Sequence, residues 1–305
     1  MNRSYLKREF INNRKLIILG VTKKCNLACE YCRKHPGAIY DVLSKKSTEL
    51  QLKKESWNRI IEIAKINNAA EVMITGGEPF EYPYLVELCK YLINNSIHVS
   101  IHTNGVSPFF ERVLDEIALA ALDIDFHLST ELFPTLQREL RGCELPISFI
   151  KKATSIGRNI ELKVTITEKM LSYKETLLEK LYEWVDLGVA SIRFQPVIKI
   201  NDAMRDGIEL TKNSIVLIDL IEEYMQHDSR LQGIIRNNRA SFEATRRILQ
   251  NDVITKDIVE QCCAKNAIIF IQTDEIIGDC KTIWNKDENC DCVDCFDMVC
   301  CGFLA

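Results

Sequence analysis

Between residues 16 and 200, short β-like runs alternate with longer helical patterns. Apolar runs rich in Val and Ile, bounded by turn residues, predict strands at 16–21, 71–75, 97–102, 123–129, 160–167 and 190–195. Apolar residues at helical spacing predict helices at 52–66, 82–94, 108–119, 147–156 and 174–187. Such alternation gives right-handed βαβ units and a parallel sheet. The pattern leaves open whether this sheet is doubly wound or an open barrel of about three quarters of a (β/α)8 ring.

Length and charge limit the classes of protein that fit this pattern. With 305 residues the chain is long enough for one large α/β domain and a small appendage. Its net charge of −4 gives no general attraction to nucleic acid or to an anionic membrane. Residues 1–15 contain no apolar signal-peptide core, and no apolar run reaches the length of a membrane span. We therefore expect a cytoplasmic protein without a nucleic-acid or membrane partner.

Three cysteines follow the first predicted strand in a C-x3-C-x2-C spacing: Cys25, Cys29 and Cys32. A cubane iron–sulfur cluster prefers four thiolates, and runs that bind clusters use short spacings of this kind. Three thiolates alone would leave one iron open to a small molecule. A zinc site completed by His35 is the alternative. The polarity of the loop speaks against three unrelated buried cysteines.

Polar and small residues follow the next two predicted strands. Gly76, Gly77 and Glu78 come after the second strand, and Thr103 comes at the end of the third. Two glycines at a strand end let a backbone approach a ligand closely, although an ordinary βα turn would look the same. The C-terminal ends of parallel strands meet at one side of the sheet, where ligands gather. We therefore expect these residues to lie near the cysteine loop.

The remaining strands also end in polar side chains. Ser129 and Glu131 close the fourth strand, with Arg141 shortly after, while Lys163 lies on the fifth strand and Gln195 ends the sixth. If side chains alternate along the strands, these groups point into the same mouth. The alternative for each is a solvated polar residue. The sequence identifies no catalytic acid or base.

The end of the chain is unusually rich in cysteine. Of 13 cysteines, eight lie between Cys262 and Cys301. Disulfides are disfavoured in a reducing cytosol, so this clustering indicates a metal site. Residues 267–272 and 276–278 predict a β-hairpin that cysteines flank, and a C-x2-C pair follows it. An iron–sulfur cluster and a zinc site both fit these thiols. Residues 201–259 read as a mostly helical, charged connector.

The cysteine loop, with Tyr31 before its third cysteine, and the Gly-Gly-Glu segment resemble the radical S-adenosylmethionine (SAM) superfamily. The resemblance implies a partial (β/α)6 TIM-like barrel over residues 1–200. It also implies a [4Fe–4S] cluster whose open iron chelates the amino and carboxylate groups of SAM. Reduction by a donor such as flavodoxin or ferredoxin then cleaves SAM to a 5′-deoxyadenosyl radical that abstracts a hydrogen atom from substrate.

The resemblance implies roles for individual residues. Cys25, Cys29 and Cys32 would hold the cluster, the Gly-Gly-Glu backbone would bind the amino group of SAM, Ser129 would contact the ribose and Lys163 the carboxylate. The full implied set of SAM-binding residues is Tyr31, Gly76, Gly77, Glu78, Thr103, Ser129, Arg141, Lys163 and Gln195.

The tail, residues 260–305, resembles the twitch and SPASM modules that bind auxiliary clusters in many radical SAM enzymes. The full SPASM pattern has seven ligands for two clusters, whereas this chain stops four residues after Cys301. We therefore expect one auxiliary [4Fe–4S] cluster. Its expected ligands are Cys263, Cys280, Cys292 and Cys295, with Cys262, Cys290, Cys300 and Cys301 as rivals.

Relatives with such modules mostly modify peptides, forming crosslinks, thioethers, epimers or oxidised side chains, and we expect a peptide substrate here. Against this, about 15 residues precede the first strand, too few for a leader-recognition domain. The alternative is a dehydrogenase for a small molecule such as an aminosugar. A branch in molybdopterin biosynthesis ends in Gly-Gly, whereas this chain ends in Leu-Ala. A non-enzymatic iron–sulfur protein is the third possibility, but it would not need the Gly-Gly-Glu segment.

Overall fold

The structure, a computed structural model, describes residues 15–33, 51–197, 208–237, 239–250, 268–271 and 277–278. All six predicted strands are present, each with its ends within two residues of the prediction. They are β1 (Lys15–Gly20), β2 (Ala69–Thr75), β3 (His98–Thr103), β4 (Ile124–Thr130), β5 (Ile160–Ile166) and β6 (Ser191–Pro196). Two further strands follow, β7 (Ile268–Ile271) and β8 (Ile277–Gly278).

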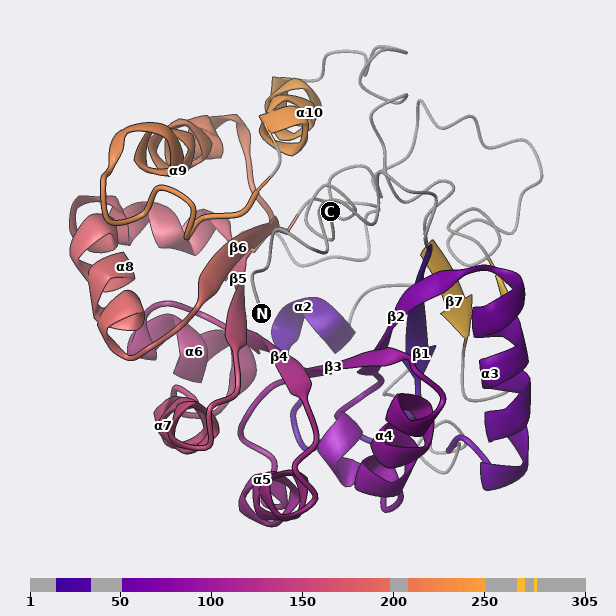
Figure 1. Cartoon of the computed structure of the whole chain (residues 1–305). Coiled ribbons are helices and arrows are strands. Elements are labelled where there is room, and N and C mark those ends of the chain that lie inside the picture. The colour runs from indigo at the N-terminus through magenta and orange to yellow at the C-terminus, as the bar shows by residue number, and fades with distance from the viewer. Residues whose placement is uncertain are drawn as a thin grey trace.

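These strands form one sheet in the order β6-β5-β4-β3-β2-β1-β7-β8. Strands β1 to β6 are parallel to their neighbours and curl into a half-barrel (Figure 1). The main helices lie along the convex side of this sheet. The open-barrel prediction is therefore confirmed, and a doubly wound sheet, which needs helices on both faces, is excluded.

The helices between the strands match their predicted positions, although most begin later. They are α3 (Trp57–Ile66), α4 (Leu85–Asn94), α5 (Phe110–Leu119), α7 (Ile147–Ser155) and α8 (Leu177–Asp186). The structure adds α2 (Glu30–Arg33) and α6 (Pro134–Arg141), together with the short 3₁₀ segments η1 (Lys54–Ser56), η2 (Pro79–Glu81), η3 (Glu168–Thr176) and η4 (Lys212–Ser214). None of the helices in these ranges is long and apolar enough to cross a membrane.

The two faces of the curved sheet differ in character. The convex face buries apolar side chains under the helices, including Val72, Ile101, Phe126, Leu162 and Phe194. This apolar layer is the hydrophobic core, and its burial supplies most of the favourable free energy of folding.

The concave face is instead polar, with Glu161 at the centre of its contacts. The Glu161 carboxylate accepts hydrogen bonds from Ser191 Oγ at 3.0 Å and Arg193 Nε at 3.1 Å, and its Oε1 lies 3.1 Å from His127 Nδ1. Lys163 Nζ lies 2.6 Å from the same carboxylate. Because buried charges are stable only when paired, this network allows ionised groups to line the inside of the half-barrel.

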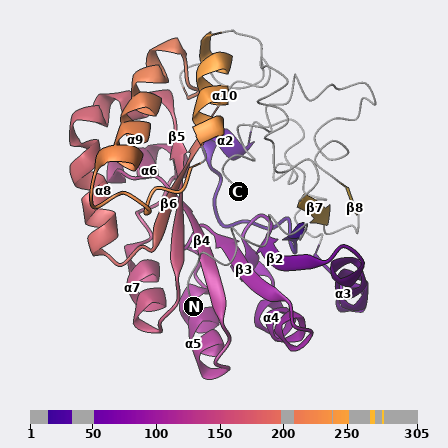
Figure 2. The ribbon, with the colours of Figure 1, turned by 45° about the horizontal axis from the view of Figure 1, so that its top comes forward.

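The described part of the predicted helical connector lies against the outer edge of β6. It contains α9 (Ile215–His227) and α10 (Arg239–Gln250), which pack against each other (Figure 2). The loop between them pairs with β6, because Ile192 N donates to Ile234 O and Arg236 N to Ile192 O, both at 2.9 Å. The Asn237 amide continues this pairing with both backbone groups of Phe194. The connector therefore covers the edge that β6 would otherwise expose.

The predicted C-terminal hairpin is confirmed for its two strands, since β8 is antiparallel to β7. The structure adds that β7 pairs in parallel with β1, so that the hairpin extends the main sheet. His35 and all the tail cysteines, among them the proposed ligands Cys263, Cys280, Cys292 and Cys295, lie outside the described residues.

Candidate functional site

The cysteine loop leaves the C-terminal end of β1 and is held there by the Gly-Gly-Glu segment after β2. Gly77 N donates to Thr22 O at 2.7 Å, and Glu78 N donates to Lys24 O at 2.8 Å. A Cβ on Gly76 would lie 2.5 Å from Thr22 O, and one on Gly77 would lie 2.6 Å from the Lys24 carbonyl carbon. Both glycines are therefore needed so that the backbone of the cysteine loop can approach.

The segment after β3 supports the loop from a second direction. Asn104 Nδ2 donates to Asn26 Oδ1 at 2.8 Å, and Asn26 Nδ2 donates to Val106 O at 3.2 Å. An ion pair between Lys24 Nζ and Glu81 Oε2, at 2.9 Å, adds a link to η2. These contacts lie on both sides of Cys25. Asn104 was not predicted as a site residue, and its place next to Thr103 was the only signal for it in the sequence.

The side chains of Glu78 and Thr103 meet each other beneath the loop. Glu78 is fully buried and accepts hydrogen bonds from Thr103 Oγ1 at 2.7 Å, Asn104 N at 2.8 Å and Phe80 N at 3.1 Å. Burial raises the pKa of Glu78 to about 7, although these donors oppose the rise. This carboxylate therefore joins the ends of β2 and β3. A contact of either side chain with SAM stays a prediction.

Two of the three predicted ligand thiols are described. Cys25 is half-buried and its Sγ accepts a hydrogen bond from Leu27 N at 3.4 Å, while Cys29 is buried. Burial raises the pKa of the Cys29 thiol, and the Arg141 guanidinium opposes the rise. Cys32 lies in α2, and its side chain is outside the described set.

The hydrogen bond to Cys25 and the burial of Cys29 fit thiolate ligands of an iron–sulfur cluster. A backbone N–H that donates to a ligand sulfur is one of the contacts that set the reduction potential of a cluster. A buried thiol becomes a stable thiolate when it ligates a metal. Among described side chains, no group of three His, Cys, Asp or Glu gathers as a metal site. Zinc completed by His35 is untested, because that residue lies outside the described ranges.

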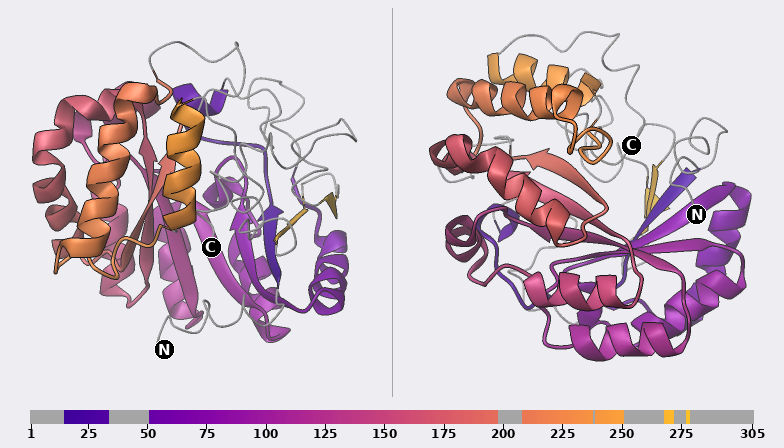
Figure 3. Two further views of the ribbon diagram at one scale, coloured as in Figure 1. Left: turned by 90° about the horizontal axis from the view of Figure 1, so that it is seen from above. Right: turned by 60° about the vertical axis from the view of Figure 1, so that its left-hand side comes forward.

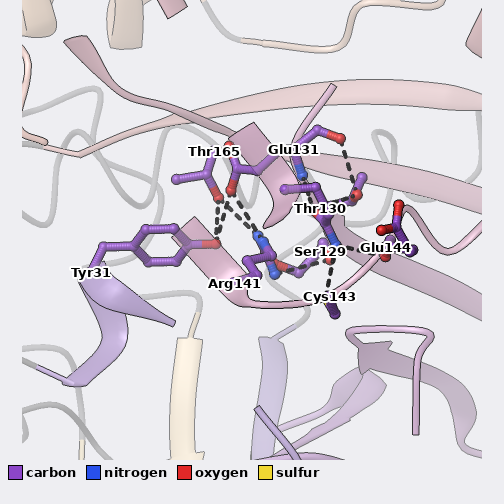
Figure 4. A network of polar contacts seen from close by, with 9 residues as sticks. Tyr31, Ser129, Thr130, Glu131, Arg141, Cys143, Glu144 and Thr165 are labelled. Atoms are coloured by element: carbon purple, nitrogen blue, oxygen red, sulfur yellow. Dashed lines mark hydrogen bonds and ion pairs between the residues drawn. The ribbon is translucent and has the colours of Figure 1, made fainter. Parts of the chain in front are cut away.

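A buried ionic network lies next to the cysteine helix (Figure 4). Arg141 Nε donates to Glu131 Oε1 at 3.1 Å, and the Tyr31 hydroxyl donates to the same oxygen at 3.0 Å. The Arg141 guanidinium also lies over the Tyr31 ring, 5.3 Å from its centroid. Burial raises the pKa of Tyr31 well above its ordinary value, so the hydroxyl keeps its proton and donates. This network joins α2 to α6 and to the end of β4.

Arg141 extends the network to the ends of two strands. It donates to Ser129 O at 3.1 Å, to Ser129 Oγ at 2.9 Å and to Thr165 Oγ1 at 3.1 Å. The structure thus brings together the predicted residues Tyr31, Ser129 and Arg141. It adds Glu131 and Thr165, which were not among the predicted SAM contacts.

The other two predicted residues lie on strands beside this network, opposite Ser129 and Thr165 in the register. Lys163 is 1% exposed and pairs with Glu161 inside the half-barrel, and burial lowers its pKa to about 8. Gln195 is half-buried at the end of β6, opposite Thr165 in the register. A contact of Lys163 with the SAM carboxylate stays a prediction, since its described partner is a carboxylate of the protein itself.

Comparisons with known proteins agree with this geometry. Residues 19–142 match the family model of the radical SAM superfamily. A probable GTP 3′,8-cyclase of Methanopyrus kandleri is 27% identical over 168 residues, which cover 53% of this chain and 51% of the relative. The GTP 3′,8-cyclase of Petrotoga mobilis is 28% identical over 186 residues, covering 59% and 55%. The matched part thus spans about half the length of these relatives.

Solved structures match over more of the chain. SuiB of Streptococcus suis, bound to precursor peptide SuiA, has a TM-score of 0.69 and 16% identity, covering 99% of this chain and 68% of that one. The enzyme anSMEcpe with bound AdoMet has a TM-score of 0.58 and 15% identity, covering 88% and 74%. At such identities the likeness shows the fold alone. Residues 19–142 thus carry a radical SAM domain, and the half-barrel that contains it is similar in fold to SuiB and anSMEcpe.

Proposed function

We propose that this chain is a radical SAM enzyme that binds a [4Fe–4S] cluster through Cys25, Cys29 and Cys32 and cleaves SAM reductively. The observation that carries the proposal is the backbone pairing of Gly77 and Glu78 with Thr22 and Lys24, since it places the cysteine loop at the mouth of the half-barrel. When bound, the cluster supplies the electron for cleavage of SAM to a 5′-deoxyadenosyl radical, which abstracts a hydrogen atom from substrate.

Arg141 is suited to orient the carboxylate of SAM. A guanidinium has five N–H donors, and the contacts described for Arg141 use four of them. The remaining hydrogen is on Nη1. Glu131 matches the charge of Arg141, so that the guanidinium keeps one orientation in the buried site. Arg141 is 5% exposed. This small exposure fits a guanidinium that reaches the mouth of the half-barrel with one edge only.

For the substrate we propose a peptide. The support is one of fold: SuiB was solved with a precursor peptide, and anSMEcpe with the Kp18Cys peptide at a TM-score of 0.56. A second candidate is GTP, which the names of the curated relatives favour, although the match covers only about half of those proteins. The polar concave face around Glu161 and Arg193 is compatible with either substrate.

The first experiment measures SAM cleavage. Protein reconstituted with iron and sulfide under anaerobic conditions is reduced with dithionite, and 5′-deoxyadenosine is quantified by mass spectrometry. We expect its formation in the wild type and its loss in Cys25→Ala. If the reduced, iron-loaded wild type forms no 5′-deoxyadenosine, the proposed function is wrong. Flavodoxin or ferredoxin in place of dithionite tests the expected physiological donor.

The second experiment separates the two substrates. The same assay is run with GTP and with any short peptide encoded next to this chain. A peptide that gains a modification and stimulates 5′-deoxyadenosine formation supports the first candidate. Conversion of GTP to a cyclised product supports the second and overturns the peptide proposal.

A further inference from the structure

The helix that carries the third cysteine cannot be stable by itself. It is α2, only four residues long, and one helical turn has an unfavourable nucleation free energy. Its position must therefore come from tertiary contacts. Tyr31, which immediately precedes Cys32, makes several such contacts. Figure 3 (left) shows α2 at one end of the curved sheet, where the Tyr31 ring packs against the border of the hydrophobic core.

The partner of Tyr31 is a carboxylate with few other donors. Glu131 is 0% exposed, and both Tyr31 Oη and Arg141 Nε bind its Oε1. Its Oε2 is buried with no hydrogen-bond partner among the described residues. A buried carboxylate is stable only if its charge is paired and its oxygens are solvated by donors. The Tyr31 hydroxyl therefore supplies, together with Arg141, one of the donors that this buried carboxylate needs.

The other side of the network is attached to the strands of the half-barrel. Glu131 follows β4, Arg141 ends α6, and Arg141 is bound to Ser129 on β4 and Thr165 on β5. The stacking of Arg141 on the Tyr31 ring adds a second contact to the same side chain. Tyr31 thus connects a single helical turn, which is unstable alone, to two strands of the barrel.

We propose that Tyr31 is a positioning residue whose hydroxyl, through the Glu131–Arg141 pair, fixes the helix of Cys32 and so keeps the cluster ligands in place. The inference rests on the proposed cluster site and gives Tyr31 a role that differs from contact with SAM. Its hydroxyl acts on the cluster through the position of α2.

The test is the rate at which a chelator removes iron from the reconstituted protein under anaerobic conditions. Tyr31→Phe keeps the ring over Arg141 and removes one hydrogen bond to a buried charge, so we expect iron loss about tenfold faster than in wild type. The matched control is Tyr82→Phe, because the Tyr82 hydroxyl is also buried and donates to Leu52 O at 2.9 Å outside this network. It should release iron at the wild-type rate.

A double-mutant cycle identifies the path of the effect. In a Glu131→Gln background, Tyr31→Phe should accelerate iron release much less than in wild type. The electron paramagnetic resonance spectrum of the reduced cluster should broaden in Tyr31→Phe and stay unchanged in Tyr82→Phe. Equal iron release by wild type and Tyr31→Phe overturns the inference alone, as does an equal acceleration in Tyr82→Phe. A wild type that holds no iron overturns the proposed function and the inference with it.

Discussion

At the scale of single residues, Cys29 is the buried one of the two described thiols among the proposed cluster ligands. It is buried, and burial disfavours its thiolate unless a cation compensates. We predict that Cys29→Ala abolishes 5′-deoxyadenosine formation and reduces the iron bound at this loop, since two thiolates are too few to hold the cluster. The control is Cys89→Ala, which removes a fully buried thiol in α4. An unchanged 5′-deoxyadenosine yield in Cys29→Ala would contradict the cluster assignment.

Glu78 should make the stability of the fold depend on pH. Its ordinary pKa of 4.5 applies to the unfolded chain, and burial raises the pKa of Glu78 in the folded chain to about 7. Between these values the folded state binds the additional proton, so stability falls as the pH rises. From pH 5.5 to pH 7.5, we expect this group to reduce the free energy of unfolding by about 2 kcal/mol.

The measurement is urea unfolding at both pH values for wild type and Glu78→Gln. Because other groups titrate equally in both proteins, the difference between their pH slopes isolates Glu78. The Gln variant should be less stable at the lower pH, where it lacks an acceptor that Glu78 provides, and its stability should decline less toward the higher pH. Identical slopes would show that the donors around Glu78 keep it ionised throughout.

Sequence spacing was sufficient to predict that the cysteine loop and the Gly-Gly-Glu segment lie close together, because each is a local pattern at the end of a strand. It was not sufficient for Glu131, whose contacts are with Tyr31, 100 residues away, and with Arg141. Nor did the pattern show that Gly77 makes room for the cysteine loop. A buried ion pair has no period in the sequence, so its members look like solvated polar residues.

At the scale of elements, the junction between the cysteine loop and the end of β2 is the most sensitive point. We predict that Gly77→Ala displaces the loop, because the new Cβ would overlap the Lys24 carbonyl group. The expected result is at least a tenfold loss of 5′-deoxyadenosine formation together with lower iron content. Iron analysis and the cleavage assay on the same preparation measure both.

The control for this change is Gly157→Ala. Gly157 has a φ of +73°, and a Cβ added to it would meet no atom within 4 Å, so alanine there adds backbone strain of about 1 kcal/mol without a clash. It should lower thermal stability slightly and leave iron and cleavage unchanged. Normal iron content in Gly77→Ala would mean that the loop adapts to the extra methyl group.

The success of the element predictions follows from how each element is buried. The strands were found because their apolar convex residues are nearly fully buried. Helix α6 was missed because it is mostly polar, and α2 because four residues carry no period. The pairing of β7 with β1 was also missed, since the two strands are about 250 residues apart and the pattern of neither specifies its partner.

At the scale of the whole molecule, the half-barrel has one polar face. Residues such as Glu71, Ser100, Glu161 and Lys163 alternate with apolar residues along their strands. A doubly wound parallel sheet is covered by helices on both faces and needs apolar residues on both. The alternation of polar and apolar residues in the strands therefore favoured the open barrel over the doubly wound sheet. This preference can be recognised only once the strand register is known.

The number of clusters is also a property of the whole chain. If the tail binds an auxiliary cubane in addition to the one at the half-barrel, we predict about eight iron atoms per chain. A variant with Cys25, Cys29 and Cys32 all changed to alanine should keep about half. Zinc in the wild type, or no iron in this variant, would contradict the auxiliary cluster. A count near twelve would indicate a second auxiliary cluster.

Among the proposed tail ligands, Cys280 is the one whose loss should be most informative. It follows β8 closely in sequence, and no cysteine is adjacent to it, unlike Cys262 and Cys263. No neighbouring thiol can therefore replace it. Cys280→Ala should lose about half of the iron and keep the spectrum of the cluster that cleaves SAM. Because β7 pairs with β1, the strand that leads into the cysteine loop, the hairpin belongs to the same sheet as the proposed SAM site.

The role of an auxiliary cluster is tested on the condition that it binds substrate or accepts electrons from it. Formation of the modified product should then fall far more in Cys280→Ala than uncoupled SAM cleavage does. Product and 5′-deoxyadenosine are quantified in the same reaction, and Cys143→Ala is the control, since Cys143 lies next to Gln137 outside the tail. Full iron and full product in Cys280→Ala would remove Cys280 from the ligand set and leave the rival cysteines to supply the fourth thiolate.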